Sequence, residues 1–352
     1  MLSGPDLPAT LLGLHHGSGL LNLRPLLDET MTAISSRHLV DPQLLPLLDS
    51  LPAFEWSEEI LPTLRSRPTR FRVEPDDLVR TEMRATQAPG PPGAPEVGVV
   101  IYRPKGAAQG PLPCIFHIHG GGYITGAASA NEGVHRPLAA HLGCCIVSVD
   151  YRLAPETRFP GAVEDCYAAL SWLVSTAAEL GVDPARIGVM GESAGGGLAA
   201  ALTLLVRDRG EHRLAFQHLI YPMIDDRTCV SATPNPYAGE FVWTIQANRF
   251  GWSSLLGAEP GGEGISPYAA AARAENLADL PPAFIATGSL DLFVEEDLSY
   301  AQRLLRSGVP VELHVYPGAF HGFQWAGDTE VSQIARRDSY AALAKAMAKP
   351  SL

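Results

Sequence analysis

The sequence predicts an α/β protein in which a mostly parallel sheet of eight strands carries helices on both faces. Downstream of residue 103, short and continuously apolar stretches alternate with longer stretches of helical character. This alternation is typical of parallel strands that are buried on both sides. The 352 residues include 34 glycines and 30 prolines, more than the usual share, which indicates many tight turns between ordered elements.

The expected elements follow one another along the chain. Two strands, at residues 78–86 and 96–103, are predicted to form a hairpin because a proline- and glycine-rich stretch separates them. The later strands are expected at 114–119, 144–149, 187–190, 216–221, 283–287 and 311–316. The helices are expected at 162–176, 195–209, 295–307 and 329–348.

Two segments depart from this alternation. Residues 1–75 hold only short amphipathic stretches that prolines interrupt. Residues 226–273 lie between two strand–helix units and are rich in aromatic residues, glycine and proline. We expect this second segment to lie above the C-terminal edge of the sheet.

Composition excludes several classes of protein. The formal net charge of −12 argues against a nucleic-acid partner, which needs a basic face. The longest apolar stretch, residues 198–206, is far shorter than the ~20 residues that span a bilayer. The N-terminus lacks the basic and apolar regions of a secretory signal. The five cysteines have no CxxC spacing, so we expect reduced and mostly buried thiols in a cytoplasmic protein.

The strongest local motif is a G-x-S-x-G sequence at residues 191–195, with Ser193 at its centre. A predicted strand precedes it and an Ala/Leu-rich helix follows, which is the context that a nucleophilic serine requires. The residues two before and two after the serine must be small, because the turn that exposes its hydroxyl is sharp. A glycine-rich turn with an idle serine is the alternative, and the flanking strand and helix disfavour it.

A second motif, His119-Gly-Gly-Gly-Tyr123, follows directly after the predicted strand at 114–119. Three glycines allow backbone N–H groups to approach a substrate oxygen closely, which side chains would block. His117 and His119 could in principle share a metal ion. No third ligand is evident, and the sequence has no HExxH or phosphate-binding loop, so we predict no metal site.

A serine nucleophile in this arrangement needs an acid and then a histidine later in the chain. Among the later histidines, His321 stands in a glycine-flanked loop just after the last predicted strand. His218 and His314 fall inside strands, and His212 lies among charged residues at a helix end. His321 is therefore the predicted base, because sites in open α/β sheets form at the C-terminal ends of strands.

The predicted acid is Asp291, which follows the strand at 283–287 at the same edge. Glu295, Glu296 and Asp297 are close in sequence but open a helix. Acidic residues in a first helical turn complement the helix dipole, which explains them without a catalytic role. Asp297 in particular is expected away from this edge, in a dipole contact or a surface pair.

Together these residues resemble the hormone-sensitive-lipase-like esterases, the bacterial family IV branch of the α/β-hydrolases. The resemblance covers roughly residues 78–348. It rests on the residues of 119–123, 150–156, 191–195 and 221–225, on the turn at Asp291 and on Gly322 after His321. Glu192 stands where the family commonly has aspartate.

The resemblance implies the α/β-hydrolase fold and an oxyanion hole formed by the N–H groups of Gly121, Gly122 and Ala194. His119 would then brace the loop rather than react. A helical cap is also implied, made of residues 1–75 and the insertion 226–273. The hydrolase core would comprise residues 76–225 and 274–352.

We therefore expect a cytoplasmic carboxylesterase in which Ser193 attacks the ester, His321 takes its proton and Asp291 orients the histidine. Its substrates are expected to be small-molecule esters with short to medium acyl chains, about C2 to C8, and no cofactor is needed. The partners considered are the substrate and a second copy of the chain, with no nucleic acid and no membrane. An amidase or peptidase with the same triad is one alternative, and a receptor on a hydrolase fold is another that the presence of His321 disfavours.

The aromatic residues of 237–252, with Phe54 or Trp56, are candidates for an apolar acyl or alcohol pocket, since such pockets are mostly apolar. The alternative is that these rings only pack the cap against the core.

Overall fold

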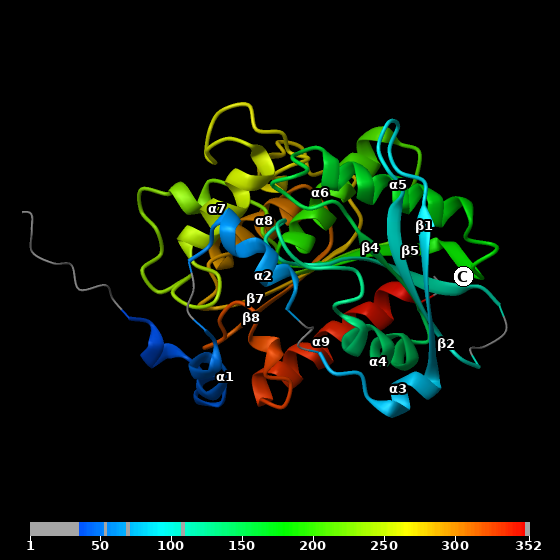
Figure 1. Ribbon diagram of the computed structural model, residues 1–352, viewed down its shortest axis with the longest axis horizontal. Coiled ribbons are helices and arrows are strands. Elements are labelled where there is room, and N and C mark those ends of the chain that lie inside the picture. Colours follow the sequence, from blue (N-terminus) through cyan, green and yellow to red (C-terminus); the bar gives the residue numbers. More distant parts are fainter. Residues whose placement is uncertain (1–34, 53–54, 68–70, 107–109, 349–352) are drawn as a thin grey trace, which may run out of the picture. The chain divides into compact units, whose positions relative to one another are not determined.

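The sheet contains eight strands in the order β1-β2-β4-β3-β5-β6-β7-β8 (Figure 1). The computed structural model describes residues 35–52, 55–67, 71–106 and 110–348. The strand β2 is antiparallel to both of its neighbours, and all other neighbouring strands are parallel. The predicted fold class, a mostly parallel eight-stranded sheet, is confirmed. The strands are β1 Thr81–Ala88, β2 Val97–Pro104, β3 Leu112–Ile118, β4 Cys145–Asp150, β5 Val182–Glu192, β6 Gln217–Ile220, β7 Ala283–Gly288 and β8 Val311–Tyr316.

Helices cover both faces of this sheet, as Figure 1 shows. The helices α4 (Glu132–Leu142) and α9 (Glu330–Met347) pack on one face. The helices α5 (Gly161–Ser175), α6 (Ala194–Arg209) and α8 (Val294–Arg306) pack on the other. The remaining helices are α1 Leu45–Ser50, α2 Leu61–Arg65, α3 Pro75–Arg80 and α7 Ile245–Leu256. None of the helices in the described residues combines the length and apolar character that a bilayer crossing requires.

The observed elements differ from the expected ones near the first strand. Residues 75–80 form the helix α3, so that β1 begins at Thr81 rather than at residue 78. Pro75 at the first helical position and Asp76 and Asp77 in the first turn favour this helix start. The helix α4 was not predicted, and it contains Pro137, a residue that ordinarily interrupts helices.

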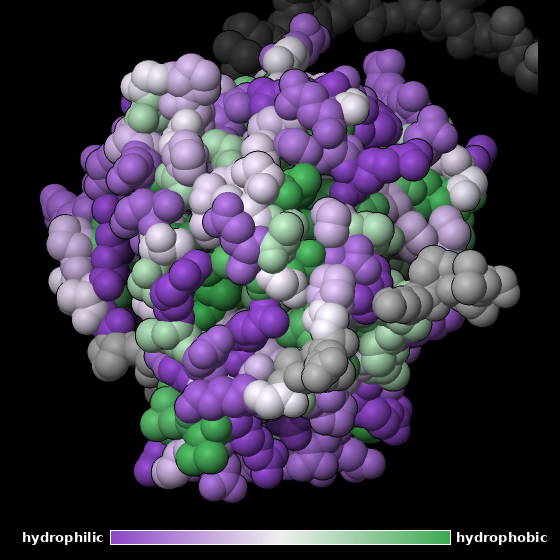
Figure 2. Space-filling model, turned by 90° about the vertical axis from the view of Figure 1, so that its right-hand side faces the viewer, coloured by the Kyte–Doolittle hydropathy of each residue, from purple (hydrophilic) through white to green (hydrophobic). Residues whose placement is uncertain are grey.

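The strands β1 and β8 form the two edges of the sheet. Figure 2 shows the side of the molecule on which β1 and β2 lie, where hydrophilic side chains predominate and hydrophobic ones are scattered. The exposed large hydrophobic residues of α3 and β1 are Leu78, Val79 and Met83. At the other edge, Leu313 and Val315 of β8 are partly exposed.

The two ends of the segment 226–273 meet in an ion pair. Asp226, which is fully buried, accepts hydrogen bonds from Arg273 Nε at 2.5 Å and from Nη2 at 2.8 Å. Its second oxygen also accepts from the backbone N–H of Gly261 at 2.6 Å. This ion pair therefore joins the start of the segment, after β6, to its end, before β7.

Replacing Arg273 by methionine should lower the free energy of unfolding by about 3–5 kcal/mol, because it leaves the buried Asp226 carboxylate without its counter-charge. Urea denaturation measures this loss. The matched control is Arg249→Met, which breaks an exposed pair with Glu259 in the same segment and should cost less than about 1 kcal/mol. Equal losses of unfolding free energy in the two variants would contradict the conclusion that the Arg273–Asp226 pair stabilises the two ends of the segment.

Candidate active site

Ser193 occupies the sharp turn between the end of β5 and the start of α6. Its backbone has φ 55° and ψ −123°, a conformation that a residue with a side chain rarely adopts and that costs about 1–3 kcal/mol. Two backbone hydrogen bonds tie it to residues at and after the end of β6, from Ser193 N to Ile220 O at 2.9 Å and from Met223 N to Ser193 O at 2.9 Å, and Gly197 N also donates to Ser193 O. The turn is thus fastened to the end of the neighbouring strand β6.

The two glycines of the G-x-S-x-G motif are required by this turn. A Cβ atom on Gly191 would lie 2.3 Å from the carbonyl oxygen of Gly195. A Cβ atom on Gly195 would lie 2.1 Å from the carbonyl oxygen of Ile118, at the end of β3. Both contacts are shorter than atoms tolerate, so any larger residue would push the serine out of place.

The structure brings Ser193 together with His321 and Asp291. The His321 Nε2 atom lies 3.0 Å from the Ser193 hydroxyl, and its Nδ1 atom lies 2.8 Å from an Asp291 carboxylate oxygen. Because a carboxylate only accepts hydrogen bonds, Nδ1 must donate and Nε2 is left to accept the serine proton. Asp291 is fully buried, and its other oxygen accepts from the N–H of Phe293 at 3.0 Å.

The loop after β3 brings backbone donors close to the serine turn. Gly121 and Gly122 have φ of 121° and 64°. A Cβ atom on Gly121 would lie 2.2 Å from the carbonyl oxygen of Thr125, so this turn accepts only glycine. Within the described residues, the N–H groups of Gly121 and Gly122 donate to no backbone carbonyl. Ala194, the first residue of α6, has no acceptor within its own helix.

His119 lies behind this loop. Its Nδ1 atom donates to the Gly120 carbonyl at 2.8 Å, and its ring stacks on Tyr151 with centroids 4.2 Å apart. Burial lowers the pKa of His119 to about 4, so the ring is neutral at pH 7. The neighbouring His117 contacts different partners, the Ser148 hydroxyl and the Glu192 carboxylate, both at 2.9 Å. Among the described residues no three His, Cys, Asp or Glu side chains are grouped to hold a metal ion.

Comparison with known proteins identifies the family. A family described as "alpha/beta hydrolase fold" matches residues 115–325. The chain is 34% identical over 304 residues to the Mycobacterium tuberculosis protein named "Esterase LipI", covering 85% of this chain and 91% of that protein. The chain belongs to the α/β hydrolases.

Further relatives agree with this family. The hydrolase is 35% identical over 287 residues to "Carboxylesterase NlhH" of Mycobacterium tuberculosis, covering 81% of this chain and 88% of that protein. The solved structure of "Bacterial Heroin Esterase" matches with a TM-score of 0.80 and 35% identity, over 89% of this chain and all of that one. The predicted relation to the hormone-sensitive-lipase-like esterases and the predicted α/β-hydrolase fold are confirmed.

The acidic residues that follow Asp291 in the hydrolase differ from expectation. Glu296 is buried and accepts hydrogen bonds from the N–H groups of Ile224 and Asp225 at 2.8 and 3.2 Å. Asp297 lies in the first turn of α8, as expected, but it is fully buried, so the expected surface pair was wrong. Burial, and then the nearby Glu296 and Asp291, raise the pKa of Asp297 well above its usual value. Sequence spacing cannot show which face of α8 is covered by the rest of the chain.

The indole of Trp243 borders the site. A Cβ atom on Gly122 would lie 2.2 Å from this indole, and the Trp243 and His321 ring centroids are 6.3 Å apart. Trp56 meets Trp243 edge-on at 5.0 Å. Of the other predicted pocket residues, Phe54 lies outside the described residues, whereas Trp252 is fully buried and packs beside Tyr123 at 5.2 Å. No motif or spacing in the sequence predicts the contact between Trp243 and Gly122.

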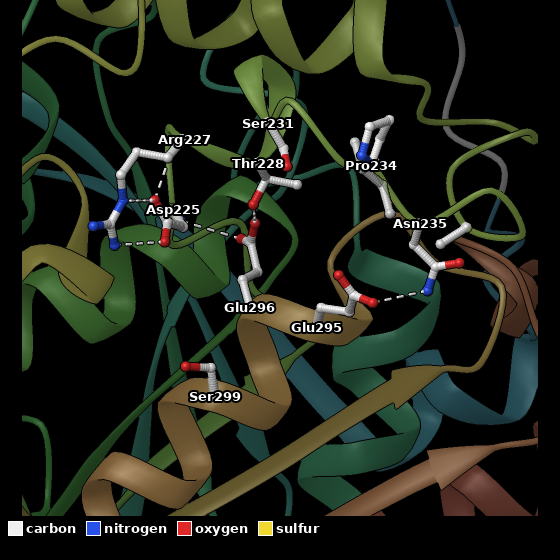
Figure 3. A pocket seen from close by; sticks show the side chains of 11 residues that line it. Asp225, Arg227, Thr228, Ser231, Pro234, Asn235, Glu295, Glu296 and Ser299 are labelled. Atoms are coloured by element: carbon white, nitrogen blue, oxygen red, sulfur yellow. Dashed lines mark hydrogen bonds and ion pairs between the residues drawn. The ribbon is translucent and has the colours of Figure 1, made fainter. Parts of the chain in front are cut away.

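A separate cavity of about 270 Å³ lies between the start of α8 and the residues that follow β6 (Figure 3). Most of its lining residues are polar, and Figure 3 shows Asp225 paired with Arg227 and Asn235 with Glu295. The lining residues do not include Ser193, Asp291 or His321. The cavity is therefore not the space above the serine.

Proposed function

We propose that this hydrolase is a serine carboxylesterase that cleaves short- to medium-chain esters through an acyl-enzyme intermediate. The observation that carries the proposal is the continuous hydrogen-bond chain from the Ser193 hydroxyl through His321 to Asp291, with distances of 3.0 and 2.8 Å. The names of the relatives, esterase and carboxylesterase, support the ester as the bond that is cleaved.

The mechanism follows from these positions. Ser193 Oγ attacks the ester carbonyl while His321 Nε2 takes its proton, and Asp291 stabilises the imidazolium that forms. The N–H groups of Gly121, Gly122 and Ala194 bind the tetrahedral oxyanion. His321 then gives its proton to the departing alcohol. A water molecule activated by the same histidine releases the acid and restores the serine.

His119 has a positioning role in this mechanism. Its neutral ring is held between the Gly120 carbonyl and Tyr151, whose hydroxyl donates to the His119 carbonyl at 2.9 Å. These contacts brace the first residue of the glycine loop, and the side chain does not need to gain or lose a proton.

Covalent labelling tests the proposal. A fluorophosphonate should label wild-type protein at one residue, Ser193, and the protein should hydrolyse nitrophenyl acetate. If folded wild-type protein is not labelled, the result would favour a receptor on a hydrolase fold. Matched ester and anilide substrates separate the remaining alternative, because an amidase or peptidase would cleave the anilide at a comparable rate.

The chain-length preference is expected to lie at about C2 to C8, with Trp243 limiting the space beside the oxyanion loop. Trp243→Ala should shift this preference toward longer chains. Burial of a methylene contributes about 0.8 kcal/mol, so room for two more should raise kcat/KM for the longer ester about tenfold relative to acetate.

A series of nitrophenyl esters from acetate to palmitate measures this shift. Tyr237→Ala is the control, since Tyr237 is an exposed aromatic residue of the same insertion and should leave the profile unchanged. A profile that is identical in wild type and Trp243→Ala would contradict the role of Trp243. Wild-type rates that rise steadily to palmitate, with activation at an oil–water interface, would indicate a lipase instead.

The division into a cap, residues 1–75 and 226–273, and a core, residues 76–225 and 274–352, is also part of the proposal, although residues 1–34, 53–54 and 68–70 of the cap lie outside the described residues. Its support is the contact of Trp56 with Trp243 and the closure of the insertion by Asp226 and Arg273.

A cytoplasmic location and a homodimer stay predictions. All five cysteines are buried free thiols, which is the state typical of a reducing compartment.

A further inference from the structure

A line of three side chains crosses the sheet directly beneath the serine turn. Ser148 of β4 and His117 of β3 are register partners, and their Oγ and Nδ1 atoms are 2.9 Å apart. His117 also lies opposite Met190 of β5, and its Nε2 atom is 2.9 Å from the carboxylate of Glu192, two residues further on. The last of these side chains therefore belongs to the residue that immediately precedes Ser193.

The helix α4 covers two of these side chains, His117 and Ser148, whereas Glu192 is partly exposed. His117 and Ser148 are fully buried, and the ring of His135 from α4 packs edge-on against His117 with centroids 4.1 Å apart. On its far side His135 meets the buried ring of Tyr102 at 5.1 Å. Water cannot replace a hydrogen bond that the buried His117 ring loses, so the partners of His117 hold this ring more firmly than exposed contacts would.

The His117–Glu192 hydrogen bond joins the two strand ends that carry the reacting groups. His117 stands two residues before His119, where the glycine loop begins, and Glu192 stands one residue before the nucleophile. The backbones also approach closely here, since a Cβ atom on Gly120 would lie 2.8 Å from the Glu192 carbonyl oxygen. This part-buried side-chain contact, together with the pairing of β3 with β5, thus ties the oxyanion loop to the serine turn.

We propose that Glu192 and His117 are positioning residues that hold Ser193 in register with the N–H groups of Gly121 and Gly122. The inference rests on the proposed function, in which those N–H groups bind the oxyanion. Both strand ends must hold their separation while the substrate carbon becomes tetrahedral. A displacement of about 1 Å at a reacting centre can cost about 10²-fold in rate.

The test compares three replacements of Glu192. Glu192→Ala removes the contact, and Glu192→Asp keeps the charge but is one methylene too short to reach His117. Both should lower kcat on nitrophenyl acetate about 10- to 100-fold, with KM changed less than about threefold. Glu192→Gln keeps the length and an oxygen that accepts from Nε2, so its kcat should stay within about threefold of wild type.

The matched control is Glu132→Ala. Glu132 pairs with Arg136 on α4 at 2.7 Å and its side chain is 24% exposed, against 21% for Glu192. It should lower the melting temperature about as much as Glu192→Ala while leaving kcat unchanged. A merely structural role for Glu192 would make the two variants alike in both measurements, and this result would overturn the inference.

A double variant tests whether the two residues act through one contact. His117→Ala combined with Glu192→Ala should reduce kcat no further than the more damaging single variant, because both remove the same hydrogen bond. Multiplied losses would overturn the inference, as would a Glu192→Gln variant as slow as Glu192→Ala.

Fluorophosphonate labelling keeps this result separate from the proposed function. The labelling rate of Glu192→Ala should fall by the same factor as kcat/KM, because both reactions need the serine and the oxyanion donors in register. Wild-type protein that neither reacts with the label nor hydrolyses esters would contradict the proposed function itself. Active wild-type protein with an unchanged Glu192→Ala variant would overturn only the positioning role.

Discussion

Replacing Ser193 by alanine is expected to lower kcat for ester hydrolysis by on the order of 10⁴ or more, the usual cost of removing a triad nucleophile. The remaining activity would come from the oxyanion donors and substrate binding alone. The replacement should lower the rate of the chemical step and leave the stability of the fold unchanged. Among the described residues, the Ser193 hydroxyl is hydrogen-bonded to His321 alone, and the backbone contacts that hold the turn do not involve the hydroxyl.

The measurement is kcat on nitrophenyl acetate, together with a thermal melt that establishes folding. Ser254→Ala is the matched control, because Ser254 is a similarly buried serine that lies on α7. It should keep wild-type activity. A folded Ser193→Ala protein that retains even a tenth of wild-type activity would contradict the proposed mechanism.

Asp291→Asn is expected to lower kcat by about 10⁴, as the equivalent change does in serine proteases. The amide matches the carboxylate in size but carries no charge to stabilise the imidazolium. Its NH₂ group can donate to Nδ1, which would then hold the proton on Nε2, where it blocks transfer from Ser193. The buried position of Asp291 leaves no water to replace the lost charge.

Asp297→Asn is the matched comparison, and it should cost less than about tenfold in kcat. The reason lies in the burial of Asp297, which raises the pKa of its carboxyl group and so favours the uncharged form. Asparagine is close to aspartate in volume and carries no charge, so the replacement should disturb the surroundings of Asp291 little. Comparing kcat of both folded variants tests the assignment, which is wrong if Asp297→Asn is the crippled protein and Asp291→Asn is near wild type.

The sequence was sufficient for features that depend on local sterics or on strand direction. The turn at Ser193 needs glycines at fixed offsets, and Gly191 and Gly195 show why, since a Cβ on either would collide with a backbone carbonyl. Asp291 and His321 could be selected because parallel strands end at one edge of the sheet, so the loops after β7 and β8 had to meet there.

The burial of the acidic residues in α8 could not be predicted from the sequence. Its first turn carries three acids, and a dipole argument treats them alike. The fold buries Glu296 and Asp297 but leaves Glu295 exposed, because Ile224 and Asp225 lie against the side of the helix that carries Glu296. The same limit applies to α3, whose proline and acidic start outweighs the strand-like residues that follow it.

The sequence by itself determined the fold class, the family resemblance and the candidate nucleophile, base and acid, because these follow from periodicity, strand direction and steric needs within a few residues. Only the tertiary structure decided which distant residues act on that site. Glu192 reaches His117 across 75 positions of the chain. Trp243 lies against Gly122, and Arg273 closes on Asp226. Such contacts depend on how sheet, helices and insertion pack together, and no spacing along the chain specifies them.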